Sequence, residues 1–459
     1  MFPTPGTRTV RPVFARPVAF AFLLFLLCLC LTACSRIAPP AHIGELVVGI
    51  RETPAFYQLE EGAGSGYEYD LAAAFALELG VKLRVVPARD PEQLAKLLRE
   101  GRIHIAMSMP IVEGNSDLFF TPPLRESSFV VAYNADGIGP DSIADLANRS
   151  ITLSAHSPAH QLLKKLPVKV KLHNWNKGDE IGLLELLSKH QADLVVTDSL
   201  HFDIASNFYP DLRIGLSLPG RIQLGWAFFD GDSELYTKAL TFVENARADG
   251  TLARLEDRYF GHIRRINYVG ITRFLEDVQT KLPDFRRDFQ VAQELTGIDW
   301  RLLAALAYQE SKWDPLATSF TGVRGMMMLT GDTADRLGVS NRLDPKQSIR
   351  AGAKYLADLA DDLPEEAKEP DRLWLALAAY NLGMGHMNGA RAIAEGLKRD
   401  PNSWYEMKKV LPLLAKPEYY ARLKSGKARG GEAVIMVENI RTYYDTLSRF
   451  EPAYRPLMN

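Results

Sequence analysis

The chain has 459 residues, of which 47% are hydrophobic and 24% charged, and its 54 Lys and Arg against 56 Asp and Glu give a formal net charge of −2. This balance excludes a mostly disordered chain and gives no electrostatic case for binding nucleic acid. The length predicts two or three domains, and only one segment is apolar enough to enter a bilayer, which excludes a polytopic membrane protein.

The N-terminal segment has the features of a secretory signal. Residues 1–33 contain three arginines and no acidic residue, and they include an apolar run over residues 18–31, which is short for a membrane span. The sequence Leu31-Thr-Ala-Cys34 resembles the lipobox of bacterial lipoproteins, in which cleavage before the cysteine is followed by its acylation. An uncleaved anchor helix is the alternative.

This resemblance implies a signal peptide over residues 1–33, a lipidated linker over 34–44 and attachment to lipid through Cys34. Cys34 is the only cysteine left after such a cleavage, so we expect neither a disulfide nor a thiolate metal site. Ser35, rather than Asp, follows the cysteine, and by the same resemblance this favours the periplasmic face of the outer membrane.

Residues 45–262 alternate strand-like and helix-like stretches, which is typical of an α/β fold with a parallel sheet. Asp70 is expected to cap a helix over 71–79. A second helix is expected over 94–98. Strands are predicted over residues 46–50, 81–86, 103–107, 151–153, 168–170 and 193–197.

From about residue 271 to the end the pattern becomes almost wholly helical. One helix is predicted over residues 300–311, and Leu303, Leu306 and Glu310 share one of its faces because they are three and four residues apart. A carboxyl group on an apolar face is costly to ionise. Glu310 is therefore either a salt-bridged core residue or a general acid kept protonated by its surroundings, and the periodicity alone leaves both open.

Five short segments of the α/β region resemble, in order, the amino-acid-binding family of periplasmic solute-binding proteins. They are Gly66-Tyr-Glu-Tyr-Asp-Leu71, Phe120-Thr-Pro-Pro123, Ser142-Ile-Ala-Asp-Leu146, Ala192-Asp-Leu-Val-Val-Thr-Asp198, and the segment from Asp249-Gly-Thr-Leu-Ala-Arg-Leu255 to Phe260-Gly261.

The resemblance implies a two-lobed regulatory domain over 45–265, with lobe 1 at about 45–133 and 222–265 and lobe 2 at about 138–218. A muropeptide, peptide or amino acid would bind in the cleft between the lobes. Glu68 and Asp198 are the expected ligand residues, with Asp198 holding an ammonium group. Gly114 stands where the family has the arginine that pairs with a ligand carboxylate, which puts the usual amino acid ligand in doubt. A structural role without a ligand is the alternative.

Four ordered motifs of the helical region resemble the soluble lytic transglycosylase domain. They are Glu310-Ser311, Gly322-Val-Arg-Gly-Met-Met-Met-Leu-Thr330, Ala378-Ala-Tyr-Asn-Leu-Gly383 and the segment from Glu432 to Ile440. The resemblance implies a mainly α, lysozyme-like catalytic domain over 270–459. The whole chain then resembles the membrane-bound lytic murein transglycosylases, as a multidomain protein in which an α/β two-lobed, periplasmic-binding-protein-like domain precedes the catalytic domain.

By this resemblance the substrate is the glycan strand of peptidoglycan. The bond cleaved is the β-1,4 bond between N-acetylmuramic acid and N-acetylglucosamine, with formation of a 1,6-anhydro sugar in cell wall turnover. Glu310 would act first as acid and then as base. One carboxyl group suffices, because the attacking hydroxyl belongs to the substrate itself. We expect no cofactor and no metal. The residues expected to contact substrate are Ser311, Met328, Tyr380, Asn381 and Glu432.

Two positions depart from the family's motifs. Met328 stands in place of a glutamine and Met436 in place of a tyrosine, and Tyr443 or Tyr444 is a candidate substitute for that phenol. The departures keep open the alternative of a non-catalytic periplasmic lipoprotein that binds glycan and a small ligand.

A cluster of basic residues lies between the third and fourth of these motifs. This cluster has two interpretations. It either faces glycan or lipid headgroups, or it is an ordinary solvated loop. Its members are Arg422, Lys424, Lys427 and Arg429.

Overall fold

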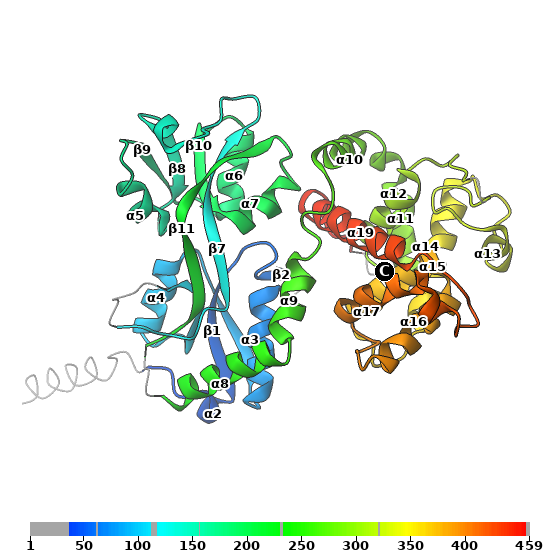
Figure 1. Cartoon of the computed structure of the whole chain (residues 1–459), viewed down its shortest axis with the longest axis horizontal. Helices are drawn as coiled ribbons and strands as arrows, with labels where there is room; N and C mark the ends of the chain where they lie inside the picture. The colour runs from blue at the N-terminus through cyan, green and yellow to red at the C-terminus, as the bar shows by residue number, and fades with distance from the viewer. Residues whose placement is uncertain are drawn as a thin grey trace, which may run out of the picture. The chain divides into compact units, whose positions relative to one another are not determined.

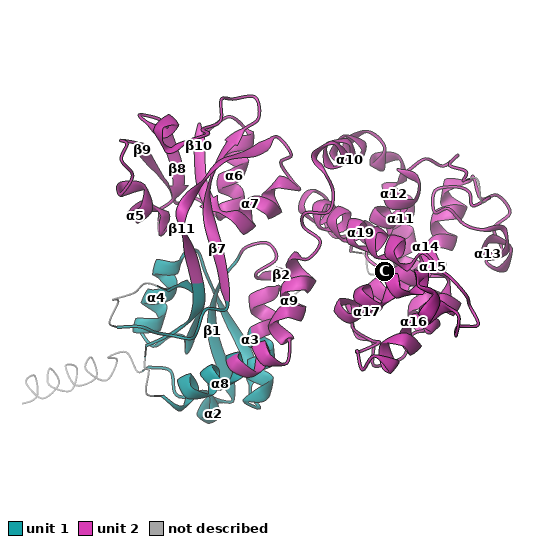
Figure 2. Ribbon diagram, in the orientation of Figure 1, with its two compact units in different colours: residues 1–52, 72–124, 224–243 teal, residues 53–71, 125–223, 244–459 magenta. Residues whose placement is uncertain are grey.

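The computed structural model describes residues 36–60, 63–111, 117–155, 157–229, 233–319 and 322–455. The expected signal peptide, Cys34 and Gly114 lie outside these ranges. The chain divides into two compact units (Figure 2), one of residues 1–52, 72–124 and 224–243 and the other of residues 53–71, 125–223 and 244–459. Among the described residues, no helix combines the length and the apolar character needed to cross a membrane.

The first unit is built on parallel strands with helices alongside them (Figure 1). Strand β1 pairs in parallel with β4, from Glu45 opposite Lys82, and with β5 on its other side. Leu94 and Leu98 of α4 pack with Val47 of β1 in the core of this unit. Its elements are α2 (Pro40–Ile43), β1 (Glu45–Arg51), most of α3 (Tyr67–Glu78), β4 (Lys82–Ala88), α4 (Pro91–Arg99), β5 (Ile105–Pro110) and β6 (Phe119–Phe120).

The α/β part of the second unit repeats this pattern. Strand β10 pairs in parallel with β8 and antiparallel with β7, and β8 pairs in parallel with β9. Two long elements, β11 (Leu212–Phe228) and α8 (Glu234–Ala248), run from one unit into the other along the chain. The remaining elements are β2 (Gln58–Glu60), β3 (Ala63–Ser65), β7 (Arg125–Asn134), a 3₁₀ turn (Ile143–Leu146), β8 (Ser150–Ser154), α5 (Ala159–Lys164), β9 (Lys171–Trp175), α6 (Glu180–Ser188), β10 (Leu194–Asp198), α7 (Ser199–Ser206) and α9 (Thr251–Phe260).

The rest of the second unit is helical (Figure 1), and it has one continuous hydrophobic core. Helix α12 lies at its centre, in contact with α11, α14 and α19. The helices are α10 (Tyr268–Thr280), α11 (Leu282–Thr296), α12 (Trp300–Ser311), α13 (Gly331–Arg336), α14 (Pro345–Asp361), α15 (Asp371–Leu382), α16 (Met384–Gly396), α17 (Trp404–Val410), a 3₁₀ helix (Leu411–Ala415), α18 (Pro417–Tyr420) and α19 (Gly430–Phe450). These elements confirm the expected order of an α/β region followed by a mainly α region.

Two local predictions were wrong. Asp70 does not cap a helix at residue 71, because α3 begins at Tyr67 and Asp70 lies in its first turn. Its carboxylate instead accepts hydrogen bonds from Tyr259 (2.7 Å) and Arg258 (3.3 Å). The strand predicted over 168–170 is found three residues later, as β9, where it pairs with β8.

Candidate functional site

The central helix α12 ends at the predicted catalytic carboxyl group. Asp299 caps its start, accepting the backbone N–H of Arg301 at 2.8 Å. From Trp300 to Tyr308 every side chain of the helix is buried, so the helix is enclosed on all sides rather than on one face. Glu310, in the last turn, is partly exposed. The helix therefore runs from the core to the edge of the domain, where the carboxyl group of Glu310 lies.

The surroundings of Glu310 change its acidity. Burial raises the pKa of its carboxyl group from about 4.5 to about 7, and the positive charge of Lys312 acts in the opposite direction. Within the described ranges, the carboxyl group has neither a hydrogen bond nor an ion pair, and no second carboxylate contributes to its pKa shift. Glu310 is thus not the salt-bridged core residue of the first interpretation, and its raised pKa favours the protonated carboxylic acid near neutral pH.

Two predicted site residues hold the same turn of the chain. The Ser311 hydroxyl donates to the backbone carbonyl of Met326 at 2.8 Å, and the Tyr380 hydroxyl donates to that of Met327 at 2.7 Å. The next residue, Met328, has φ +49° and a partly exposed side chain. Burial raises the pKa of Tyr380, and the negative charge of ionised Glu310 raises it further, so the two groups interact electrostatically. Residues from three separate motifs therefore meet at one place.

Gly325 explains how this turn fits against the rest of the domain. It has φ +82°, and a Cβ atom at this position would lie 1.8 Å from the backbone oxygen of Arg342. Only glycine fits such a close approach. The turn is also fixed from α14, where the Ser348 hydroxyl accepts the backbone N–H of Met327 at 3.1 Å.

The remaining predicted substrate residues lie farther from the carboxyl group. Asn381 is exposed at the end of α15, next to Tyr380. On α19, Asn439 donates to the side chain of Gln309 at 3.4 Å, which places it at the end of α12. Glu432 lies on the same face seven residues earlier, about 10 Å along the helix, where it is exposed and pairs with Arg429 at 3.4 Å.

The two tyrosines considered as substitutes for the missing phenol lie at opposite ends of α12, and Met436 itself is buried in the core. Tyr444 donates to Asp299 at 3.1 Å, and this cap lies at the other end of α12, about 16 Å from Glu310. Tyr443 lies near the correct end of the helix, but it is buried against Phe274, with ring centroids 4.5 Å apart.

Lys312 is a residue of this site that the sequence analysis missed. It ends α12 with φ +55°, and its ammonium group lies 4.4 Å from the ring centroid of Tyr308 and 5.2 Å from that of Tyr443. Burial lowers the pKa of Lys312 to about 8. The only sequence feature that could have pointed to Lys312 is its position two residues after Glu310. Its left-handed backbone was not foreseeable, because lysine rarely adopts it.

The two residues predicted to hold a ligand in the solute-binding-like region both lie in the second unit. Asp198 caps α7, where it accepts the backbone N–H groups of Leu200 at 3.1 Å and His201 at 3.2 Å, and it also contacts the imidazole ring of His201. Glu68 lies in the first turn of α3 and is only 2% exposed. A ligand ammonium would have to share Asp198 with these internal donors.

Arg125 is a second residue that the sequence analysis missed. Its side chain is 8% exposed, it pairs with Glu256 at 3.1 Å, and its guanidinium lies 4.4 Å from the ring centroid of Phe260. Ser127, on the same face of β7, donates to Asp198 at 3.4 Å. A buried cation therefore lies near the predicted ammonium-binding residue.

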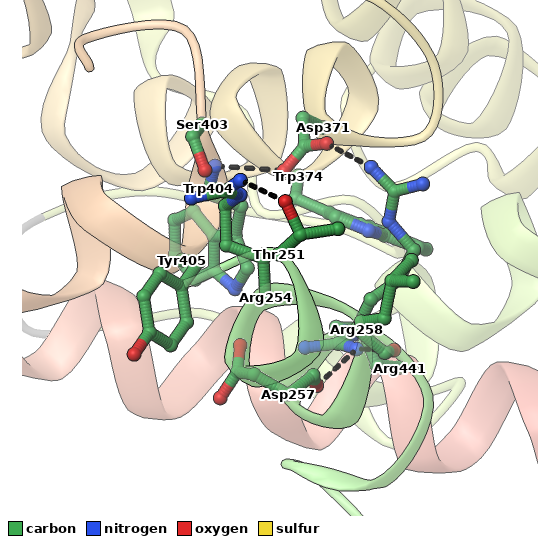
Figure 3. A pocket seen from close by; sticks show the side chains of 11 residues that line it. Thr251, Arg254, Asp257, Arg258, Asp371, Trp374, Ser403, Trp404, Tyr405 and Arg441 are labelled. Carbon is green, nitrogen blue, oxygen red and sulfur yellow. Dashed lines mark hydrogen bonds and ion pairs between the residues drawn. The ribbon is translucent and has the colours of Figure 1, made fainter. Parts of the chain in front are cut away.

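A separate pocket of about 110 Å³ lies where α9 meets α15, α17 and α19 (Figure 3). Asp371, the first residue of α15, accepts the backbone N–H of Trp404 at 2.8 Å and a hydrogen bond from Arg258 at 2.6 Å. Arg441 donates to a carbonyl in the last turn of α9 and to Glu438. The charged groups that line this pocket are thus paired with one another or with neighbouring residues, and the contact of Arg258 with Asp371 links α9 to α15, the helix that carries Tyr380.

Comparison with known proteins gives matches to both parts of the chain. Residues 46–262 match the bacterial extracellular solute-binding proteins of family 3, and residues 288–402 match the transglycosylase SLT domain. These matches confirm both resemblances drawn from the motifs.

Full-length relatives agree. The chain is 45% identical over 446 residues to the membrane-bound lytic murein transglycosylase F of Thiobacillus denitrificans, covering 95% of each chain. Two relatives with the same name are each 41% identical to this chain. The protein of Nitrosospira multiformis matches 89% of this chain and 86% of its own length, and that of Methylobacillus flagellatus matches 95% of each. The matches do not favour the non-catalytic alternative.

Proposed function

This chain belongs to the membrane-bound lytic murein transglycosylase F family of peptidoglycan-degrading enzymes, and on that premise we propose that it cleaves the β-1,4 bond after N-acetylmuramic acid and leaves a 1,6-anhydro end, in cell wall turnover. One observation carries the proposal. Glu310 is a lone, partly buried carboxyl group whose pKa is raised to about 7, at the meeting point of three motifs.

The proposed reaction needs one group that gives a proton and then takes one. Protonated Glu310 donates to the glycosidic oxygen of the departing N-acetylglucosamine as the bond to C1 breaks. The resulting carboxylate accepts the proton of the muramoyl 6-hydroxyl as that oxygen bonds to C1. No water is consumed, and the enzyme returns to its starting protonation state. A pKa near the working pH suits both steps.

The groups around Glu310 support this sequence of steps. Ser311 and Tyr380 fix the carbonyls of the turn at Met326–Met327, so the surface beside the carboxyl group is set before substrate arrives. A one-carboxylate site also fits an internal nucleophile better than hydrolysis by two carboxyl groups.

Mass spectrometry of the products released from purified sacculi tests the proposal. A soluble form starting at Ser35 would be compared with Glu310→Gln, which keeps the shape of the side chain but is not an acid. We expect anhydro-muramoyl products from the parent and none from the variant. Reducing-end products that depend on Glu310 would identify a hydrolase. Binding to sacculi without any products would point to the binding lipoprotein.

We also propose that acylation of Cys34 anchors the protein to the outer membrane with its domains in the periplasm. The lipobox-like sequence and Ser35 support this. Cys34→Ser should abolish incorporation of labelled fatty acid and release the protein from the membrane fraction. Labelling that persists in the variant would refute the assignment.

For the solute-binding-like region, we propose that a muropeptide, peptide or amino acid binds and regulates the enzyme. The match to family 3 supports it. Calorimetric titration with these three ligand classes, repeated with Asp198→Asn and Glu68→Gln, tests it. Equal affinity in parent and variants would remove these two residues from the site, and no binding of any class would leave a structural role.

A further inference from the structure

A basic loop, defined here as residues 416–429 and including the short helix α18, connects the 3₁₀ helix at Leu411–Ala415 to α19. It carries five basic residues and a single acidic one, Glu418. All five basic side chains are exposed. They are Lys416, Arg422, Lys424, Lys427 and Arg429.

The loop is held in place rather than loosely attached. The backbone N–H of Ala428 donates to the carbonyl of Leu414 at 3.1 Å, and Leu423 and Ala428 pack on the core of the helical domain. At its end, Gly430 comes so close to Leu411 that a Cβ atom would lie 1.9 Å from the Leu411 oxygen. The basic groups therefore have a fixed position on the domain.

Of the five basic residues of this loop, only Arg429 has an ion pair among the described residues, with Glu432 at 3.4 Å. Among the described residues, Lys416, Arg422, Lys424 and Lys427 form no ion pair. Elsewhere in the same domain basic side chains are commonly paired, as Arg286 is with Glu451 at 2.6 Å. Four unpaired cations within twelve residues create a local positive potential that attracts anionic groups.

The loop also directly precedes α19, the helix that runs towards Glu310. Helix α19 begins directly after it, carries Glu432 in its first turn and reaches the end of α12 at Asn439, which contacts Gln309 beside Glu310. Glu432 and Asn439 are about 10 Å apart along α19, so a glycan strand that left Glu310 along this helix would reach the loop within a few sugar lengths. In peptidoglycan, every second sugar carries a stem peptide. Each stem peptide ends in a free carboxylate.

We propose that the basic loop binds the carboxylates of peptidoglycan stem peptides and so favours peptide-bearing glycan over bare glycan. This rests on the proposed function. Exposed ion pairs are individually weak and are screened by salt. The loop therefore contributes to the capture of substrate, which is measured by kcat/KM. It does not contribute to the chemical step at Glu310.

The test compares two triple variants of the soluble form starting at Ser35. Arg422→Gln/Lys424→Gln/Lys427→Gln removes three charges from the loop, whereas Lys346→Gln/Lys368→Gln/Lys398→Gln removes three exposed charges elsewhere on the domain. Each is assayed on intact sacculi and on glycan strands stripped of peptides by an amidase. Scanning calorimetry of each variant checks that it is folded before its rates are compared.

On intact sacculi at low salt we expect the loop variant to lose about five-fold to tenfold in kcat/KM. The loss should disappear at about 0.5 M salt, where the screening length is about 4 Å. On stripped strands, the loop variant and the parent should be equal, and the control variant should match the parent on both substrates.

Three results would overturn the proposal. Equal losses on intact and stripped strands would mean that the loop acts on glycan, and equal losses in the two variants would mean a net-charge effect. If the loop variant cleaves sacculi normally but no longer binds vesicles containing phosphatidylglycerol, the loop faces lipid. The stripped-strand assay separates these results from failure of the proposed function, because an inactive parent cleaves neither substrate.

Discussion

The raised pKa of Glu310 makes a quantitative prediction about pH. With a pKa of about 7, the carboxyl group is about 90% protonated at pH 6, half protonated at pH 7 and about 1% protonated at pH 9. A glutamate with the ordinary value of about 4.5 would be only about 0.3% protonated at pH 7. Because the general acid must be protonated, kcat/KM should fall about tenfold per pH unit above 7, and about 90-fold between pH 6 and pH 9.

The same shift affects stability, and its sign follows from linkage. The folded pKa lies above the unfolded one, so the stabilising effect of the protonated form is complete below about pH 4.5 and is lost as the pH rises towards 7. The loss amounts to at most about 3 kcal/mol. Glu310→Gln cannot ionise and escapes this loss. Relative to the parent, the variant should therefore gain stability between pH 4 and pH 8 while losing activity.

Both parts can be measured on the soluble form starting at Ser35. Initial rates of release of anhydro-muropeptides at low substrate give kcat/KM from pH 5 to 9.5, and scanning calorimetry of parent and Glu310→Gln gives the stability difference at each pH. An alkaline limb centred below pH 5, or a flat profile up to pH 9, would refute the assignment of a raised pKa. A stability difference that is the same at pH 4 and pH 8 would refute the physical cause given for it.

Three further predictions concern the surroundings of Glu310. Lys312→Met removes the positive charge that lowers the pKa of Glu310, so the alkaline limb of the pH profile should move to higher pH. Lys312→Arg keeps the charge and should leave the limb in place. An unchanged limb in both variants would contradict the electrostatic role of Lys312. Ser311→Ala leaves the buried carbonyl of Met326 without its 2.8 Å donor, which should cost about 1–3 kcal/mol of stability by calorimetry and reduce turnover; an unchanged melting temperature would show that the bond is not needed. Gly325→Ala would place a methyl group 1.8 Å from the Arg342 oxygen and should destabilise the domain severely, whereas Gly322→Ala, with φ +84° but open space around it, should cost only about 1 kcal/mol; similar melting temperatures for the two would mean that the turn can move.

The sequence predicted several helices and strands correctly, because the signals for them are local. Asp299 followed by an apolar segment predicted the start and end of α12 correctly, and the observed helix is Trp300–Ser311. Two local predictions failed where a distant contact decided the outcome. Asp70 is bound by Arg258 and Tyr259 instead of capping a helix. The strand predicted over 168–170 forms instead as β9, where it pairs with β8.

The sequence also determined which residues to examine, since the motifs around Glu310, Ser311 and Tyr380 stand in it in order. It did not determine what surrounds them. Periodicity placed Glu310 on an apolar face and could not separate a paired glutamate from a protonated one. That distinction depends on how much water and how many charges reach the carboxyl group after helices far apart in the chain have packed.

Tertiary structure alone decided the rest of the site. Ser311 and Tyr380 meet at the turn of Met326 and Met327 because α12 and α15, seventy residues apart along the chain, pack around it. The left-handed backbone at Met328 and Lys312 opposes their local preference and is held by such contacts. A sequence encodes local preferences directly, but desolvation and strained conformations arise only when the assembled domain excludes water and supplies the contacts that outweigh those preferences.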